Sequence, residues 1–209
     1  MPWGRKVPEA FYARPVAQVA RELVGCVLVR KLESGETLAG RLVEVEAYLG
    51  DGSDPSSHSH GGNTPRCRSM FGPPGRLYAY RSYGIHTCVN AVCEAKDSGA
   101  AVLFRAAEPL RGIETMRTLR GLPANAKGRT IASGPGRLAQ AFGFDLEDDG
   151  ASLLGPSLAV YRPAAPADVR TVLAGPRVGI SRAAALPYRF FLEDHALVSG
   201  RRNAAGTRA

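Results

Sequence analysis

The sequence predicts one α/β (α+β) domain in which strands outnumber helices, and three observations support this. A chain of 209 residues with 44% apolar content can build one substantial core without a separate linker. Residues 26–33 and 37–49 have the pattern of two strands joined by a tight Ser-Gly turn, which is typical of antiparallel pairing. Pro15, followed by apolar residues at helical spacing and then by Gly25, predicts a short helix before these strands.

The same signals place the later elements. Further strands are predicted at residues 76–82, 85–93, 99–107, 158–161, 177–180 and 189–192. Helices are predicted at 109–122, with Leu110, Ile113 and Met116 facing inward, and at 133–143, with Ser133 as the N-cap. Residues 50–75 are too rich in Gly, Ser and Pro for regular structure and form a long loop, which is usually functional or disordered. Residues 201–209 are expected to be a flexible basic tail, so the core of the single domain 1–209 spans about residues 8–200.

Composition excludes several classes of protein. No apolar stretch approaches the roughly 20 residues that cross a bilayer, and the N-terminus lacks the pattern of a secretory signal. The four cysteines contain no Cys-x-x-Cys pair and are too sparse for a disulfide scaffold. We therefore expect a cytoplasmic protein with reduced cysteines, no structural zinc and no membrane partner.

The net charge of +8 comes mainly from arginine, whose planar fork pairs well with phosphate. A polyanionic partner and an arginine-biased proteome explain this charge equally well. The segment from Tyr78 to Gly84 is more informative, because it interleaves tyrosines with arginine and so offers flat surfaces for bases beside a partner for phosphate. Tyr83, next to Gly84, lies past the strand alternation and is a candidate wedge at a turn.

Two further patterns suggest chemistry but have ordinary explanations. Alternation from residue 43 to 49 places Glu44, Glu46 and Tyr48 on one strand face, which must meet solvent or a cleft. A half-buried Glu46 would suit a general base, although a solvated strand face is the simpler interpretation. Glu46 with His58 and His60 could form a metal site, although histidines in a Gly/Ser loop are more often surface residues.

Ordered motifs along the chain carry a family resemblance. They are Glu46-Ala47-Tyr48-Leu49-Gly50, His58-Ser59, Gly61-Gly62, Thr64-Pro65-Arg66, Met70-Phe71, Tyr78-x-Tyr80-x-x-Tyr83-Gly84, Asn90, the run Leu103 to Pro109, Ser133-Gly134-Pro135, Arg177-Val178-Gly179-Ile180 and Pro187-Tyr188-Arg189-Phe190. From about Pro8 to Gly200 the sequence resembles the alkyladenine DNA glycosylases, also called the mammalian-type 3-methyladenine DNA glycosylases. That family's fold is a single α/β domain around a curved, mainly antiparallel sheet with flanking helices.

The resemblance also implies roles for individual residues. Glu46 would hold and deprotonate the attacking water, and Arg105 would orient that water. Tyr48 and His58 would sandwich a base flipped out of the duplex, and Tyr80 would pack against its edge. The other implied pocket residues are Asn90, which disfavours guanine by crowding its exocyclic amine, and Leu103. The implied DNA contacts are Tyr83, which fills the hole in the duplex, Thr64 and Met70 on neighbouring bases, and Gly136 and Arg137 on the phosphate backbone.

The implied function is a base-excision-repair glycosylase for alkylated or deaminated purines such as 3-methyladenine, 7-methylguanine, hypoxanthine and ethenoadenine. Only four lysines occur and none lies in a pocket motif, so we expect a monofunctional enzyme that leaves an abasic site, with no metal and no other cofactor. The expected partner is double-stranded DNA, bound by a monomer at the bacterial nucleoid. The alternatives are a metal nuclease built on Glu46, His58 and His60, and a binding module whose tyrosines only stack on bases.

Overall fold

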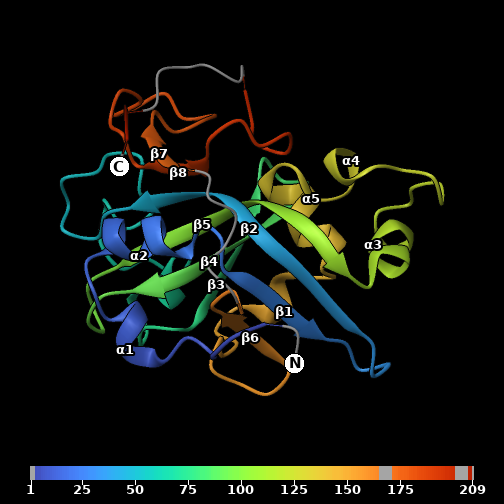
Figure 1. The fold of residues 1–209 in the computed structure, drawn as a ribbon. Helices are drawn as coiled ribbons and strands as arrows, with labels where there is room; N and C mark the ends of the chain where they lie inside the picture. The colour runs from blue at the N-terminus through green and yellow to red at the C-terminus, as the bar shows by residue number, and fades with distance from the viewer. Residues whose placement is uncertain (1–2, 165–170, 201–206, 209) are drawn as a thin grey trace.

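The computed structural model describes residues 3–164, 171–200 and 207–208. Its strands form one curled antiparallel sheet in the order β3-β4-β5-β2-β8-β7-β9, and β1 pairs with β2 and β6 beside this path (Figure 1). The strands are β1 (Val27–Lys31), β2 (Thr37–Tyr48), β3 (Leu77–Ser82), β4 (His86–Cys93), β5 (Ala100–Arg111), β6 (Leu158–Tyr161), β7 (Val172–Gly175), β8 (Arg189–Leu192) and β9 (Thr207–Arg208). The predicted α/β class with a mainly antiparallel sheet is confirmed.

The described helices are short and flank the sheet. They are α1 (Glu9–Tyr12), α2 (Val16–Leu23), α3 (Ile113–Leu119), α4 (Gly128–Ala132), α5 (Pro135–Ala141) and the 3-10 turns η1 (Arg68–Phe71) and η2 (Leu146–Asp148). Helix α2 begins after Pro15 and buries an apolar face against β2 and β5, as its spacing predicts. Helices α3, α4 and α5 gather near one end of β5, and α5 packs on β4 and β5 (Figure 1).

Strand β2 organises the sheet. Strand β5 pairs with β2 from Ala39 to Tyr48, while the other edge of β2 pairs first with β1 and then, at Glu44–Glu46, with β8. Register shifts in the pairing with β5 fall on both sides of Glu44. Such irregularities bend a strand and redirect its side chains, so the strand bends where its acidic residues lie.

Both faces of β2 are covered, which corrects the expectation that Glu44 is an ordinary exposed strand residue. Every residue from Leu42 to Ala47 is buried, and Glu44 and Glu46 are both 0% exposed. The alternation correctly puts the two carboxylates on one face. It could not show that β8, which lies about 145 residues later in the chain, brings Arg189 to cover Glu44.

Three local predictions were wrong. Strand β5 continues to Arg111, so Leu110 is a 42% exposed strand residue and not an inward helical one. Residues 177–180 form no strand, and the neighbouring strand β7 ends before them. Ser133 does not cap α5: the N-cap is Gly134, and the Ser133 hydroxyl donates to the backbone carbonyl of Leu197.

The predicted flexible tail is described only in part. Residues 201–206 and 209 lie outside the described residues, whereas Thr207 and Arg208 form β9 and pair with Ala174 and Leu173 of β7. Among the described helices, none is long and apolar enough to cross a membrane.

Candidate active site

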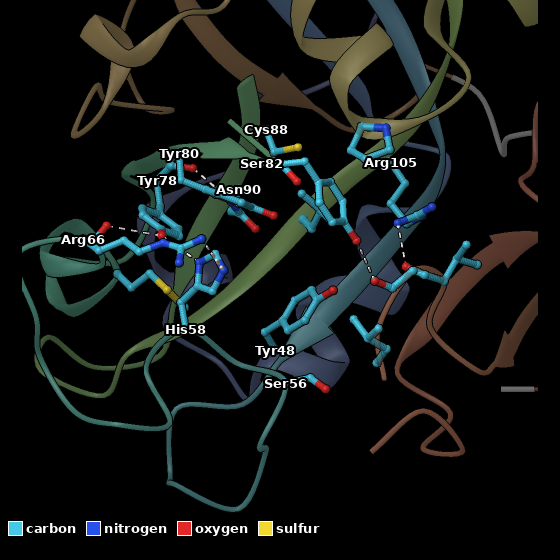
Figure 2. A pocket seen from close by; sticks show the side chains of 17 residues that line it. Tyr48, Ser56, His58, Arg66, Tyr78, Tyr80, Ser82, Cys88, Asn90 and Arg105 are labelled. Atoms are coloured by element: carbon cyan, nitrogen blue, oxygen red, sulfur yellow. Dashed lines mark hydrogen bonds between the residues drawn. The ribbon is translucent and has the colours of Figure 1, made fainter. Parts of the chain in front are cut away.

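A cavity of about 430 Å³ is lined by residues of β2, β3, β4 and β5, and the long loop 50–75 and residues 178–180 complete its wall. This volume lies within the usual range of small-molecule pockets, roughly 300–1,000 Å³. Figure 2 shows the lining side chains converging on this space, with Arg66 and Arg105 at opposite ends of the view. Tyr48, His58, Tyr80, Asn90, Leu103 and Arg105, which the resemblance assigns to the site, all line it.

Glu46 lies behind the Arg105 end of the cavity. Its Oε1 accepts the backbone N–H of Val178 at 2.7 Å. Its Oε2 accepts the Tyr48 hydroxyl at 2.9 Å and Arg105 Nη1 at 3.2 Å. Arg105 Nη1 also lies 3.5 Å from the carbonyl oxygen of Val178, so Glu46, Arg105 and Val178 form a small polar group at the cavity wall.

Opposing influences act on the Glu46 carboxyl. Burial raises its pKa above the ordinary value, and the neighbouring charge of Glu44 acts in the same direction. The charge of Arg105 and the hydrogen bonds from Val178 and Tyr48 lower it, but the pKa stays raised overall. A carboxylate with a raised pKa is a stronger proton acceptor near neutral pH than an exposed glutamate.

Glu44 belongs to the charge network behind the site. It accepts Arg189 Nη1 at 3.1 Å and the backbone N–H of Ser199 at 2.9 Å, and it lies 3.4 Å from Arg105 Nε. Arg105 therefore bridges Glu44 and Glu46, and the charges of these two carboxylates keep the pKa of Arg105 above its ordinary value although burial opposes this. The two acidic residues share one cation, and sequence reasoning missed this contribution of Glu44.

Aromatic rings form the opposite wall. Tyr78 and Tyr80 stack with ring centroids 5.4 Å apart, and the His58 ring meets Tyr80 edge-on at 4.6 Å. Tyr48 lines the same cavity from the end of β2, and its hydroxyl is fixed on Glu46. Apolar aromatic walls of this kind suit a flat heterocycle.

The hydrogen bonds of His58 define its protonation. Arg66 Nη2 lies 3.3 Å from His58 Nε2, and because a guanidinium only donates, Nε2 must be the acceptor. The proton then resides on Nδ1, which donates to the Tyr78 hydroxyl at 2.9 Å, and that hydroxyl donates to the Arg66 carbonyl. Burial and the charge of Arg66 lower the pKa of His58 to about 4, so the ring is neutral at physiological pH.

Asn90 and Leu103 are paired residues of β4 and β5 and are nearly fully buried at the cavity. The Asn90 side-chain amide donates to the backbone carbonyl of Tyr78 at 3.0 Å. This bond fixes which way the amide points, so Asn90 is a rigid part of the wall.

Tyr83 is the most exposed large hydrophobic residue described, at 85%, and lies at the tip of the β3–β4 hairpin. Its φ is 50° and that of Gly84 is 74°, two successive left-handed residues that are typical of a tight primed hairpin turn. Such a conformation is costly for a bulky residue and holds the ring away from the sheet. Tyr83 also borders the cavity, which makes the predicted wedge geometrically available.

The other residues predicted to contact DNA differ in their exposure to solvent. Thr64 and Arg137 are exposed, whereas Met70 is 3% exposed and packs in a small cluster with Tyr78 at the cavity wall. Gly136 lies so close to His86 that an added Cβ would be 2.9 Å from the His86 Cβ and 3.0 Å from the Cγ of its imidazole, which favours glycine there. The roles assigned to these residues stay predictions.

The cavity-lining residues without a role in the sequence reasoning include two that hold predicted site residues, Val178 and Arg66. Val178 and Arg66 occur in motifs that carried the resemblance, Arg177-Val178-Gly179-Ile180 and Thr64-Pro65-Arg66, but their spacing alone gave no reason to place them at the pocket. For the metal-nuclease alternative, no group of three or more His, Cys, Asp or Glu side chains suited to hold a metal occurs within the described part of the chain.

Comparison with known proteins gives a consistent result. Residues 10–196 match the family described as "Methylpurine-DNA glycosylase (MPG)". A Rhodopseudomonas palustris (strain HaA2) protein named "Putative 3-methyladenine DNA glycosylase" is 47% identical over 196 residues, covering 94% of this chain and 91% of that protein. Proteins of the same name from Methanoculleus marisnigri and Agrobacterium fabrum are each 46% identical and cover 93% of this chain, and 99% and 92% of their own lengths. The chain therefore belongs to the methylpurine-DNA glycosylase family.

Proposed function

We propose that this protein is a base-excision-repair DNA glycosylase that flips an alkylated or deaminated purine out of duplex DNA and hydrolyses its N-glycosidic bond. One observation carries the proposal: the buried Glu46 is held by Val178, Arg105 and Tyr48, which themselves line an aromatic cavity that has an exposed tyrosine at its border. The nearness of a candidate general base, a flat pocket and a candidate wedge supports this proposal. Family membership supports the same function.

The chemistry follows from the contacts of Glu46. An ionised carboxylate has about four acceptor positions. Three of them receive Val178, Tyr48 and Arg105, which leaves one on Oε1 for a water. That water's oxygen attacks the anomeric carbon of the deoxyribose, its proton passes to Glu46, and the bonding electron pair leaves with the purine nitrogen. The negative carboxylate also stabilises the oxocarbenium character that develops on the sugar.

Substrate selection rests on extrusion and on the pocket walls. Extruding a base costs a few kcal/mol and less when alkylation or mispairing has weakened its pair. Tyr48 and the neutral His58 would then sandwich the base, with Tyr80 at its edge. A cationic base such as 3-methyladenine or 7-methylguanine leaves without being protonated, whereas hypoxanthine or ethenoadenine depends more on contacts with Asn90 and Leu103.

No lysine occurs among the described residues that line the cavity, so no amine is placed to form a covalent intermediate with the sugar. We therefore infer a monofunctional enzyme that leaves the abasic strand intact. We further propose that the protein acts as a monomer at the bacterial nucleoid, without a metal.

The direct test is base release from dimethyl-sulfate-treated duplex DNA in EDTA. We expect free 3-methyladenine and 7-methylguanine, and strand breaks only after alkaline treatment. Direct strand cleavage that EDTA abolishes would instead favour a metal nuclease, and binding without any released base would favour a non-enzymatic module.

A further inference from the structure

A buried ion pair lies behind the pocket and has no part in the chemistry described so far. Arg177 Nη1 and Nη2 donate to Asp54 Oδ2 and Oδ1 at 2.6 and 2.7 Å, a bidentate geometry. Both side chains are 0% exposed. Burial alone would raise the pKa of Asp54, but the hydrogen bonds and charge of Arg177 outweigh it and the pKa is lowered, so the pair is ionic.

The pair contacts the segments that carry three functional groups of the site. The Arg177 guanidinium carbon lies 4.6 Å over the Tyr48 ring, and Arg177 Nη1 donates to the Ala47 carbonyl at 3.0 Å. Arg177 does not line the cavity whereas Tyr48 does, so the guanidinium covers the ring from behind. The next residue, Val178, donates its N–H to Glu46.

Asp54 connects this arrangement to the loop that carries His58. Its Oδ2 accepts the backbone N–H of Leu49 at 3.2 Å, and its Oδ1 accepts that of Ser56 at 3.1 Å. The carboxylate thereby fixes both the start of the loop after β2 and the turn that leads into His58. One guanidinium, that of Arg177, therefore helps to position three groups. It stacks on Tyr48, it holds Asp54 and so the turn before His58, and it adjoins Val178, which binds Glu46.

We propose that Arg177 and Asp54 are positioning residues of the glycosylase reaction: they set the stacking face of Tyr48 and the Val178 N–H that orients Glu46. The inference rests on the proposed function. Neither residue lines the cavity, so both would act through the residues that they hold.

Stability alone does not account for such a pair. Buried ion pairs can often be replaced by apolar residues of similar size without loss of stability, because desolvation offsets the attraction of the charges. Arg177 Nε, moreover, is buried without a hydrogen-bond partner, which is a cost to folding. What an apolar pair could not reproduce is the geometry: a planar cation stacked on Tyr48 while it donates in two directions.

Arg177→Lys tests this role, since lysine keeps the charge but loses the fork and the stacked plane. The matched control is Arg30→Lys, because Arg30 also stacks on an aromatic ring, Phe144 at 4.5 Å, and pairs with an aspartate, Asp148 at 2.7 Å, yet Phe144, unlike Tyr48, does not line the cavity. A second variant, Arg177→Met with Asp54→Asn, removes both charges and leaves one side-chain acceptor oxygen, for either the Leu49 or the Ser56 amide. It preserves the fold if the single substitution does not.

The readouts are single-turnover excision of 7-methylguanine from a duplex, affinity for the same DNA, thermal unfolding and the pH dependence of the rate. The charged or titratable groups facing Glu46 are Glu44, Tyr48, Tyr80, Arg105 and Arg177, with Arg189 behind Glu44. Because the Val178 N–H lowers the pKa of Glu46, its displacement should move the acid limb of the rate profile to higher pH.

We expect both Arg177 variants to lose about 10²-fold in rate with DNA affinity nearly unchanged, as a displacement of about 1 Å in a reacting group can produce. The acid limb should shift upward in both, while Arg30→Lys should match the parent in rate and profile. If folded Arg177 variants keep the parental rate and profile, the inference is overturned. A parent that releases no base would instead overturn the proposed function, and the inference with it.

Discussion

Tyr83→Ala tests the predicted wedge with little effect on the folding of the protein. The side chain is 85% exposed, and its one hydrogen bond within the described protein is a 3.4 Å contact to the Gly179 carbonyl. Tyr83→Ala should therefore change the free energy of unfolding by no more than about 0.5 kcal/mol. Stacking of an aromatic side chain on a base contributes about 1–3 kcal/mol. If the ring stabilises the flipped state, excision from duplex DNA should fall by about 5- to 150-fold.

The assay compares single-turnover release of 7-methylguanine from duplex and single-stranded DNA, since an unpaired base needs no wedge. Tyr83→Phe keeps the ring and removes only the contact to Gly179, so it should stay near the parental rate. An equal loss on both DNA forms, or a parental duplex rate for Tyr83→Ala, would refute the wedge.

Three further outcomes follow from the buried groups. Glu44→Gln leaves Arg189 without its carboxylate, so urea denaturation should show that the free energy of unfolding falls by about 3–5 kcal/mol. The pH–rate profile should also move to lower pH, because Glu44 raises the pKa of Glu46. A fall of less than about 1 kcal/mol in the free energy of unfolding would contradict this. Asn90→Ala removes a rigid side chain from the wall and enlarges the cavity, so the ratio of guanine-derived to adenine-derived bases released from alkylated DNA should rise. A fixed ratio would show that Asn90 is only structural. His58 has a pKa lowered to about 4, so its ring NMR signals should not titrate between pH 5 and 8, and Arg66→Gln should raise that pKa; a midpoint near 6.5 in the parent is incompatible with the structure.

Local patterns in the sequence predicted much of the sheet because hairpins are local. The alternation around Glu46 and the turn signals around β1 to β4 involve neighbouring residues, and the structure has these strands close to the predicted bounds. Leu110 was misplaced because its apolar spacing suits either helix or strand, and pairing of β5 with β2 decides in favour of strand.

The candidate site was predictable where it follows from the motifs, and less so where it depends on distant segments. Val178 and Arg189 reach Glu46 and Glu44 from more than 130 residues away, and no periodicity records such a contact. The predicted environment of Glu44 was therefore wrong, although the strand face predicted for it was correct. Similarly, the lowered pKa of His58 comes first from burial and then from the charge of Arg66, and both depend on the tertiary structure.

The central claim is that Glu46 accepts the proton of the attacking water. Its most direct test is single-turnover release of 7-methylguanine by Glu46→Gln, with a binding titration at fixed salt and a check of folding. Glutamine keeps the shape but cannot accept the proton, so we predict a fall of about 10²- to 10⁴-fold in the rate with DNA affinity retained. A near-parental rate, or the joint loss of binding and activity in a folded protein, would contradict the general-base role of Glu46.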